Sequence, residues 1–271
     1  MGAWDRKWDG SIAVLTLTRP PINALDREAL GELDRLLQDL ESTHHTRAAV
    51  IASGLEGVFC TGGDLKYWRT VPDGADVARA GRSVFARLES LPLPTIAAIN
   101  GQVIGDGLAL ALACDLRIAA PGASFRLPEL GYGFIPGWGT ISRLTSAVGR
   151  APATRLLLTG QGIEVREAAA IGLVGHVASP GRLREEAIAE AHHLTAASST
   201  ALRAAKCALR GSDDPACFAR IWGRADWKEG IEALLQGRPP RFSDQDERGE
   251  PGDLPGGVPA DRAADRRNRC C

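Results

Sequence analysis

The sequence predicts a layered α/β fold, because apolar runs with strand composition alternate with a segment of helical periodicity. Residues 12–18 are rich in aliphatic side chains, and Arg19-Pro20-Pro21 ends this run since proline cannot donate to a ladder. Asp26 is suited to cap the helix that follows. Residues 48–53 form the next apolar run. Strand, helix and strand in this order indicate a sheet covered by helices. The predicted helix has leucines at helical spacing, at positions 30, 33, 36, 37 and 40.

The alternation continues to the middle of the chain and then gives way to helices. A strand at 95–99 is followed by glycine turns, a helix at 107–113 and a strand at 116–119. We expect an α/β core over residues 1–199 and a helical region over 200–243. From about Asp244 the chain has almost no large apolar residue, so residues 244–271 are expected to be disordered. The predicted helices of the second half are 151–159, 165–171, 183–196, 200–209 and 227–235.

Charge and the apolar runs exclude several classes of protein. The 32 basic and 33 acidic side chains are interspersed, and the net charge is -1. No concentrated basic surface exists to hold a phosphate backbone, so a nucleic-acid partner is not expected. The N-terminus lacks the apolar stretch of a signal peptide, and no run is long enough to span a bilayer. We expect a cytoplasmic protein with no membrane partner.

The cysteines do not have the spacing of a zinc site or the density of a disulfide scaffold, so thiols and no bound metal are expected. Cys114 lies in an alanine- and leucine-rich segment and is expected to be a small buried residue. Cys60 is nearer the candidate chemistry, but no histidine motif accompanies it, which disfavours a nucleophilic role.

Three segments carry the candidate chemistry: residues 59–65, 100–107 and 128–137. In the first two, a strand leads through glycines to a predicted helix start, where backbone N–H groups are unpaired and point outward. Two such ends that converge on one oxygen would form an oxyanion hole. Glycine-rich turns also serve tight turns and close packing, so one turn alone is weak evidence.

In order and spacing these segments resemble the crotonase superfamily, the enoyl-CoA hydratase/isomerase family, over residues 10 to 243. The segments at 114–119, 158–160, 168–177 and 228–231 support the resemblance. It implies a spiral of ββα units with a C-terminal helical trimerisation region, which makes trimers and often hexamers. It also implies a coenzyme A thioester as substrate, or an acyl-carrier-protein thioester, with no metal or redox cofactor.

The resemblance also maps a site onto this chain. The backbone N–H groups of Gly63 and Asp106 correspond to the pair that binds the thioester oxygen, and Glu129 corresponds to the general acid/base. Tyr67, Trp68 and Trp138 are expected to line the acyl tunnel, with packing as the alternative for each. The full set of expected substrate contacts is Cys60, Gly62, Asp64, Leu65, Tyr67, Trp68, Gly105, Ala109, Pro128 and Trp138.

The chain departs from the hydratase pattern at Ala109. Hydratases of the family usually carry two glutamates, and Ala109 replaces one of them, which leaves Glu129 as the single base. Isomerases of the family use only the glutamate that corresponds to Glu129. Some hydratases of cinnamoyl-type thioesters also retain only that glutamate. Isomerisation is therefore slightly favoured over hydration. Decarboxylation or another lyase activity is the next alternative. The remaining alternative is a catalytically silent subunit that binds a thioester.

Asp106 is the second departure, because the family normally has glycine or another small residue there. We interpret it as a helix-terminal carboxylate favourable to the helix dipole, with a substrate-contacting or catalytic carboxylate as the alternative. Glu129 lies among small and apolar residues, where desolvation is expected to raise its pKa. Tyr132 is expected to be packed.

Overall fold

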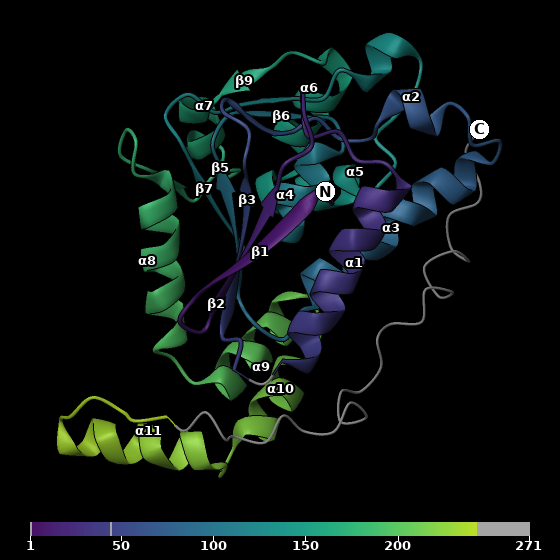
Figure 1. Ribbon diagram of the computed structural model, residues 1–271. Coiled ribbons are helices and arrows are strands. Elements are labelled where there is room, and N and C mark those ends of the chain that lie inside the picture. The colour runs from purple at the N-terminus through teal and green to yellow at the C-terminus, as the bar shows by residue number, and fades with distance from the viewer. Residues whose placement is uncertain (1, 44, 243–271) are drawn as a thin grey trace.

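The predicted α/β class is confirmed in the computed structural model, which describes residues 2–43 and 45–242 (Figure 1). In the larger sheet the first two strands pair in antiparallel orientation, and every other neighbouring pair is parallel. The larger sheet has the order β1 (Trp4–Asp9), β2 (Ile12–Leu17), β3 (Ala48–Ser53), β5 (Thr95–Ile99), β7 (Leu116–Ala119) and β10 (His176–Val177). The smaller sheet has the order β4 (Val58–Cys60), β6 (Gln102–Ile104), β8 (Ser124–Arg126) and β9 (Ile163–Glu164).

The chain builds the two sheets together by a repeated ββα unit. Strand β3 of the larger sheet leads to β4 of the smaller sheet and then to helices α2 (Leu65–Trp68) and α3 (Gly74–Ser90). The next unit is β5, β6 and α4 (Gly107–Ala113), and the third is β7, β8 and the 3₁₀ helix η1 (Glu129–Tyr132). The candidate site residues therefore follow equivalent strands of the smaller sheet.

The larger sheet is covered on both faces. Side chains that alternate along β2, β3 and β5 point to α8 (Leu183–Thr195) on one face, where Ala187 and Ala191 are fully buried. The intervening side chains join a larger core with α1 (Arg27–Ser42), α3 and α4 on the other face. In Figure 1, α8 accordingly lies on one side of the sheet, and α1 and α3 lie on the other.

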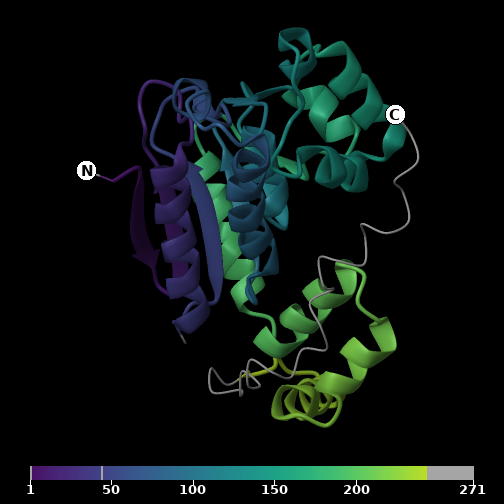
Figure 2. The ribbon, with the colours of Figure 1, turned by 90° about the vertical axis from the view of Figure 1, so that its right-hand side faces the viewer.

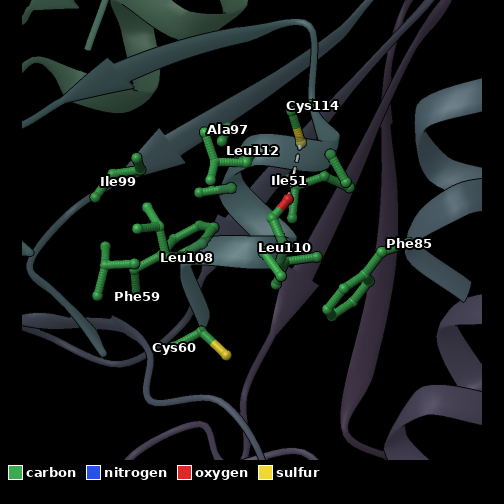
Figure 3. Close-up of a cluster of buried hydrophobic side chains, with 14 of the residues drawn as sticks. Ile51, Phe59, Cys60, Phe85, Ala97, Ile99, Leu108, Leu110, Leu112 and Cys114 are labelled. Carbon is green, nitrogen blue, oxygen red and sulfur yellow. Dashed lines mark hydrogen bonds between the residues drawn. The ribbon is translucent and has the colours of Figure 1, made fainter. Parts of the chain in front are cut away.

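Helix α4 is buried along its whole length (Figure 3). Leu108, Leu110 and Leu112 belong to the same core cluster as Phe59 and Phe85. Cys114 follows this helix and is buried, as the sequence predicts. Burial raises the pKa of the Cys114 thiol to about 12, so it is protonated at neutral pH.

The predicted strands β2, β3, β5 and β7 and the predicted helices lie within two residues of their observed bounds. Helix α1 begins after Asp26, whose carboxylate accepts a hydrogen bond from the Ala29 N–H at 2.9 Å. Strand β1 was not predicted, because most of its side chains are exposed and it has no apolar period. Helix α3 was not predicted either, although its Asp73 cap and buried Val84, Phe85 and Leu88 are helical signals.

The helices of the second half are α5 (Thr140–Val148), α6 (Arg150–Thr159), α7 (Val165–Ala170), α9 (Ser199–Leu209), α10 (Asp214–Ile221) and α11 (Ala225–Gln236). Helices α9 to α11 extend from one end of the larger sheet (Figures 1 and 2). Within residues 2–43 and 45–242, no helix is long and apolar enough to cross a membrane. The predicted tail at 244–271 lies outside the described residues.

Helix α9 is fixed to the core by Lys206, which is 7 % exposed. Its ammonium group donates to the Leu93 carbonyl oxygen and to the Asp115 carboxylate. Asp115 also accepts hydrogen bonds from the N–H and hydroxyl groups of Thr95. The buried cation therefore has a carboxylate partner, as burial requires, and it joins the C-terminal helices to the larger sheet.

Candidate active site

Two glycine-rich loops are in direct contact at the ends of β4 and β6. A β-carbon placed on Gly107 would lie 2.1 Å from the Cys60 carbonyl oxygen. One placed on Gly62 would lie 2.9 Å from the backbone nitrogen of Asp106, and Gly62 also has φ +83°. Only residues without a β-carbon allow this approach, because the atoms on the other side are backbone. The glycines therefore bring the main chain at Gly63 and Asp106 together.

The backbone N–H groups of Gly63 and Asp106 are left free at this contact. Neither donates a hydrogen bond to another atom in the part of the chain that the structure describes. On either side of Gly63 the chain is held, since Leu25 N–H donates to Gly62 O at 2.7 Å and Asp64 N–H donates to Leu25 O at 2.8 Å. Two fixed donors without acceptors can bind an oxygen that carries negative charge.

Glu129 lies beside the second loop and is 5 % exposed. A β-carbon on Gly105 would be 2.4 Å from Glu129 Oε1, and Gly105 has φ +56°, so glycine is required there for two reasons. The other oxygen, Oε2, is buried with no hydrogen-bond partner among the described residues.

The surroundings of Glu129 change its protonation. Burial raises the pKa of Glu129 to about 7, and the negative charge of Asp106 adds to the effect, while a hydrogen bond from its own backbone N–H opposes it. A carboxyl group with this pKa exchanges protons readily at neutral pH.

Asp106 lies at the N-terminus of α4, the helix-terminal position that the sequence predicts, but its carboxylate makes no capping hydrogen bond there. Its oxygens instead accept three hydrogen bonds from the segment that leads into α5: from the backbone N–H of Gly137 at 3.1 Å, the backbone N–H of Trp138 at 3.1 Å and the Thr140 hydroxyl at 2.6 Å. Burial raises the pKa of Asp106, and these three hydrogen bonds lower it. Asp106 thus has a free backbone N–H, and its carboxylate connects its loop to segment 137–140 by hydrogen bonds.

Trp138 is buried between α3 and the loop that carries Gly63, with 2 % of its surface exposed. Its ring lies edge-on to Trp68 and to Phe85, with centroids 5.8 Å apart in each pair. Its Nε1–H donates to Val77 O at 2.9 Å. A β-carbon on Gly81 would be 2.1 Å from the indole, so α3 needs glycine at that position.

The residues after Gly63 have mainly structural partners. The Asp64 carboxylate accepts hydrogen bonds from Lys66 N–H at 3.0 Å and from Tyr67 N–H at 3.3 Å, and it pairs with Arg19 at 3.0 Å. Tyr67 is half-buried, edge-on to Trp68 at 4.9 Å, and Leu65 is exposed. The Asp64 carboxylate therefore fixes the loop that carries Gly63.

Two predicted substrate contacts, Cys60 and Ala109, have fully buried side chains that a substrate cannot reach. The Cys60 thiol donates to the Asn23 carbonyl oxygen at 3.2 Å, and burial raises its pKa to about 12. The Cys60 side chain therefore belongs to the core (Figure 3). Pro128 is half-buried and precedes η1, and its carbonyl oxygen accepts from Gly131 N–H at 3.0 Å.

Tyr132 was expected to be packed, and this prediction is wrong, since the side chain is 75 % exposed. Helix η1 buries only its first residue, Glu129, and the chain then turns outward at Gly133, with φ +82°. Phe134 and Ile135 are exposed in the same turn.

Sequence reasoning missed three residues that shape this site: Arg19, Gly81 and Thr140. Arg19 pairs with the carboxylates of both Asp26 and Asp64. Gly81 makes room for Trp138, and Thr140 donates to Asp106. Thr140 lies 34 residues from its partner in the chain, so no local pattern could have identified it.

The ββα units, the two glycine loops in contact and the buried glutamate are the features that a resemblance to the crotonase superfamily implies, and comparison with known proteins shows the family. The profile of the enoyl-CoA hydratase/isomerase family matches residues 7–245. The chain belongs to this family, whose members include lyases and isomerases that act on acyl-CoA thioesters.

Individual relatives cover most of the chain. It is 35% identical over 248 residues to the Arabidopsis thaliana protein named "Probable enoyl-CoA hydratase 2, mitochondrial", covering 87% of this chain and 82% of the relative. It is 35% identical over 237 residues to the mitochondrial methylglutaconyl-CoA hydratase of Mus musculus, covering 81% and 75%. The crystal structure of an enoyl-CoA hydratase from Bacillus anthracis superposes with a TM-score of 0.84 at 31% identity, covering 90% of this chain and all of that one.

Proposed function

We propose that this enzyme forms and reprotonates the enolate of an acyl-CoA thioester, with Glu129 as its single acid/base. The observation that carries the proposal is the buried Glu129 carboxylate, with one oxygen unpaired, a pKa of about 7 and close packing against Gly105. The free N–H groups of Gly63 and Asp106 serve as the oxyanion hole. The reaction requires no metal or redox cofactor.

The reaction begins when the thioester carbonyl oxygen accepts hydrogen bonds from both N–H groups. Glu129 takes a proton from the α-carbon, and the electron pair of the broken C–H bond moves onto the carbonyl oxygen as an enolate. Each oxyanion donor typically stabilises such a charge by roughly 2.7–4 kcal/mol. In a 3-enoyl thioester, Glu129 then returns the proton two carbons away, and the double bond moves into conjugation with the carbonyl group.

Isomerisation is our first candidate because Ala109 cannot supply the second carboxylate that would hold and activate water. Hydration is the second candidate, and the relatives named as hydratases favour it. In that reaction water adds to a 2-enoyl thioester through the same enolate. Decarboxylation or another lyase reaction, or binding without turnover, would be the remaining outcomes.

A screen of thioesters in heavy water tests the proposal and separates these outcomes. Saturated, 2-enoyl, 3-enoyl, 3-hydroxy and malonyl-type thioesters would be incubated with the enzyme and followed by mass spectrometry. We expect deuterium at the α-carbon and interconversion of 3-enoyl and 2-enoyl isomers. A gain of water indicates hydration, and a loss of carbon dioxide indicates decarboxylation. No exchange with any thioester would contradict enolate chemistry. The same acyl groups attached to the pantetheine arm of a carrier protein test whether the enzyme acts on free coenzyme A thioesters or on carrier-protein thioesters.

The pH dependence of kcat/KM is expected to report Glu129. The base acts in its ionised form, so kcat/KM should rise with pH through a limb near 7 and then level off. Asp106→Asn removes a charge that raises the pKa of Glu129, so the limb should move to lower pH. The measurement is kcat/KM as a function of pH for the wild type and for Asp106→Asn, at constant ionic strength. An unmoved limb, or one at higher pH, would contradict it.

We also propose that the enzyme is a homotrimer or a homohexamer. The C-terminal helices expose large apolar side chains to an extent that is unusual for a monomer. We expect size-exclusion chromatography with light scattering to give three or six times the chain mass of 28.7 kDa. A monomer at micromolar concentration would argue against it. The exposed side chains are Leu209, Phe218, Trp222, Ile231, Leu234 and Leu235.

A further inference from the structure

We propose that Cys207 and Cys217 are the site of a reversible disulfide, which forms by exchange with a small-molecule disulfide such as oxidised glutathione and fixes helix α9 to helix α10. The two helices are consecutive in the chain and lie side by side as a hairpin (Figures 1 and 2). Both cysteines are free thiols in the structure. The inference concerns the C-terminal helices alone, so it does not depend on the reaction proposed above.

The end of α9 directs Cys207 toward the connection between the two helices. Gly211 N–H donates to Ala208 O at 2.9 Å, and Gly211 has φ +89°. Ser212 N–H donates to Cys207 O at 3.3 Å. These two hydrogen bonds form a Schellman motif, which favours glycine at its left-handed position. The motif folds Ser212 back onto the last turn of α9, where the Cys207 thiol donates to the Ser212 hydroxyl at 3.2 Å.

The start of α10 directs Cys217 to the same place. Asp213 caps this helix, because its carboxylate accepts from Ala216 N–H at 3.2 Å and its carbonyl oxygen accepts from Cys217 N–H at 2.9 Å. A side chain at the position of Cys217 commonly packs on the residue that precedes the cap. That residue is Ser212, which already contacts Cys207. The two helix ends therefore bring both thiols to one residue of the connection.

The two thiols are in contact at this point. The Cys217 thiol is hydrogen-bonded to the Cys207 sulfur, and burial and this hydrogen bond both raise the pKa of Cys217. Cys217 is 5 % exposed and Cys207 is half-buried, whereas the nearby Leu209 and Phe218 are exposed. The thiols therefore lie on the inner side of the hairpin. A small molecule can reach Cys207, and Cys217 is held next to it as a protonated thiol.

The disulfide forms in two exchange steps. The Cys207 thiol loses its proton to water, and the thiolate attacks one sulfur of oxidised glutathione. The S–S bond of the glutathione breaks, and one glutathione thiolate leaves. Cys217 loses its proton in turn and attacks Cys207 Sγ of the mixed disulfide, so that the second glutathione thiolate leaves. The two cysteines have then lost two electrons and two protons, and one glutathione disulfide has been reduced to two thiols.

Peptide mapping of the full-length chain tests the site. The reduced protein is incubated with oxidised glutathione under native conditions, its remaining thiols are blocked, and tryptic peptides are analysed by mass spectrometry without reductant. Trypsin puts the two cysteines on separate peptides, 207–210 and 211–220. We expect these two peptides to be joined, and we expect dithiothreitol to separate them. Cys60 and Cys114 should remain thiols, because both are buried.

Amide hydrogen exchange and a matched variant complete the test. Closure of this short loop should slow exchange of the amides of residues 211–220 by at least about tenfold relative to the reduced protein. Cys217→Ser has nearly the same size but cannot form the bond, so it should retain glutathione on Cys207 and show no slower exchange. Three results in the wild type would overturn the inference: glutathione on Cys207 without a link to Cys217, a link only to Cys270 or Cys271, or unchanged exchange in the cross-linked protein.

Discussion

Glu129→Gln is expected to lower α-proton exchange and turnover by at least about a hundredfold, within the usual contribution of general acid/base catalysis. Glutamine has nearly the same shape but cannot accept the proton. Since Ala109 has no ionisable group, no second carboxylate on α4 can take over. Thioester binding should survive, because the N–H groups of Gly63 and Asp106 are untouched. Deuterium incorporation at the α-carbon and steady-state kinetics give the two rates, and calorimetric titration gives binding.

A lower folding stability should not account for the loss of activity in Glu129→Gln. The folded state raises the pKa of Glu129 from 4.5 to about 7, so the native carboxyl binds its proton more tightly than the unfolded one. The wild type therefore loses stability as pH rises through this range, and the neutral glutamine variant does not. At pH 8 Glu129→Gln should be at least as stable as the wild type. Glu28→Gln, an exposed position in the first turn of α1, is the matched control. Undiminished exchange in folded Glu129→Gln would sink the single-base mechanism.

The fold could be predicted where the signals are local. The apolar runs of β2 and β3 and the leucine stripe of α1 are burial patterns with a period that the sequence shows directly. Strand β1 has no such pattern, because it lies at the edge of the sheet and pairs with β2 alone. Its Trp4 side chain is held by a hydrogen bond from Nε1 to Ala29 O at 3.0 Å, a contact 25 residues away in the chain.

The site likewise has a part that local sequence signals predict and a part that depends on contacts distant in the chain. The proposed donors Gly63 and Asp106 and the proposed base Glu129 came from motif resemblance, and the structure brings their loops together through the glycines of both turns. The partners of the Asp106 carboxylate lie 31 to 34 residues further along the chain, so only the tertiary structure could identify them. For the same reason, burial of Cys60 and exposure of Tyr132 were not readable from their neighbours in sequence.

Gly107→Ala is expected to lower kcat by about 10² to 10³-fold, the effect of removing one oxyanion-hole donor. The added methyl group would lie 2.1 Å from the Cys60 carbonyl oxygen and 2.7 Å from its carbon, so the two donor loops must move apart. Both atoms are backbone, and β4 and β6 hold the two loops, so neither side can yield cheaply. In the proposed mechanism, the N–H groups of Gly63 and Asp106 could then no longer bind the same oxygen.

The matched control for Gly107→Ala is Gly74→Ala, because both glycines are the first residue of a helix. Nothing lies within 4 Å of a β-carbon at Gly74, and its φ is not in the left-handed region, so this variant should keep full turnover. Circular dichroism and thermal unfolding would establish that Gly107→Ala is folded at the assay temperature. Glu129 keeps its own contacts with Gly105 in this variant, so the fall should appear in kcat while the pH limb near 7 stays in place. A folded Gly107→Ala enzyme with wild-type turnover would show that the convergence of the two loops is not what stabilises the enolate, and a shifted limb would show that the substitution acts through Glu129 instead.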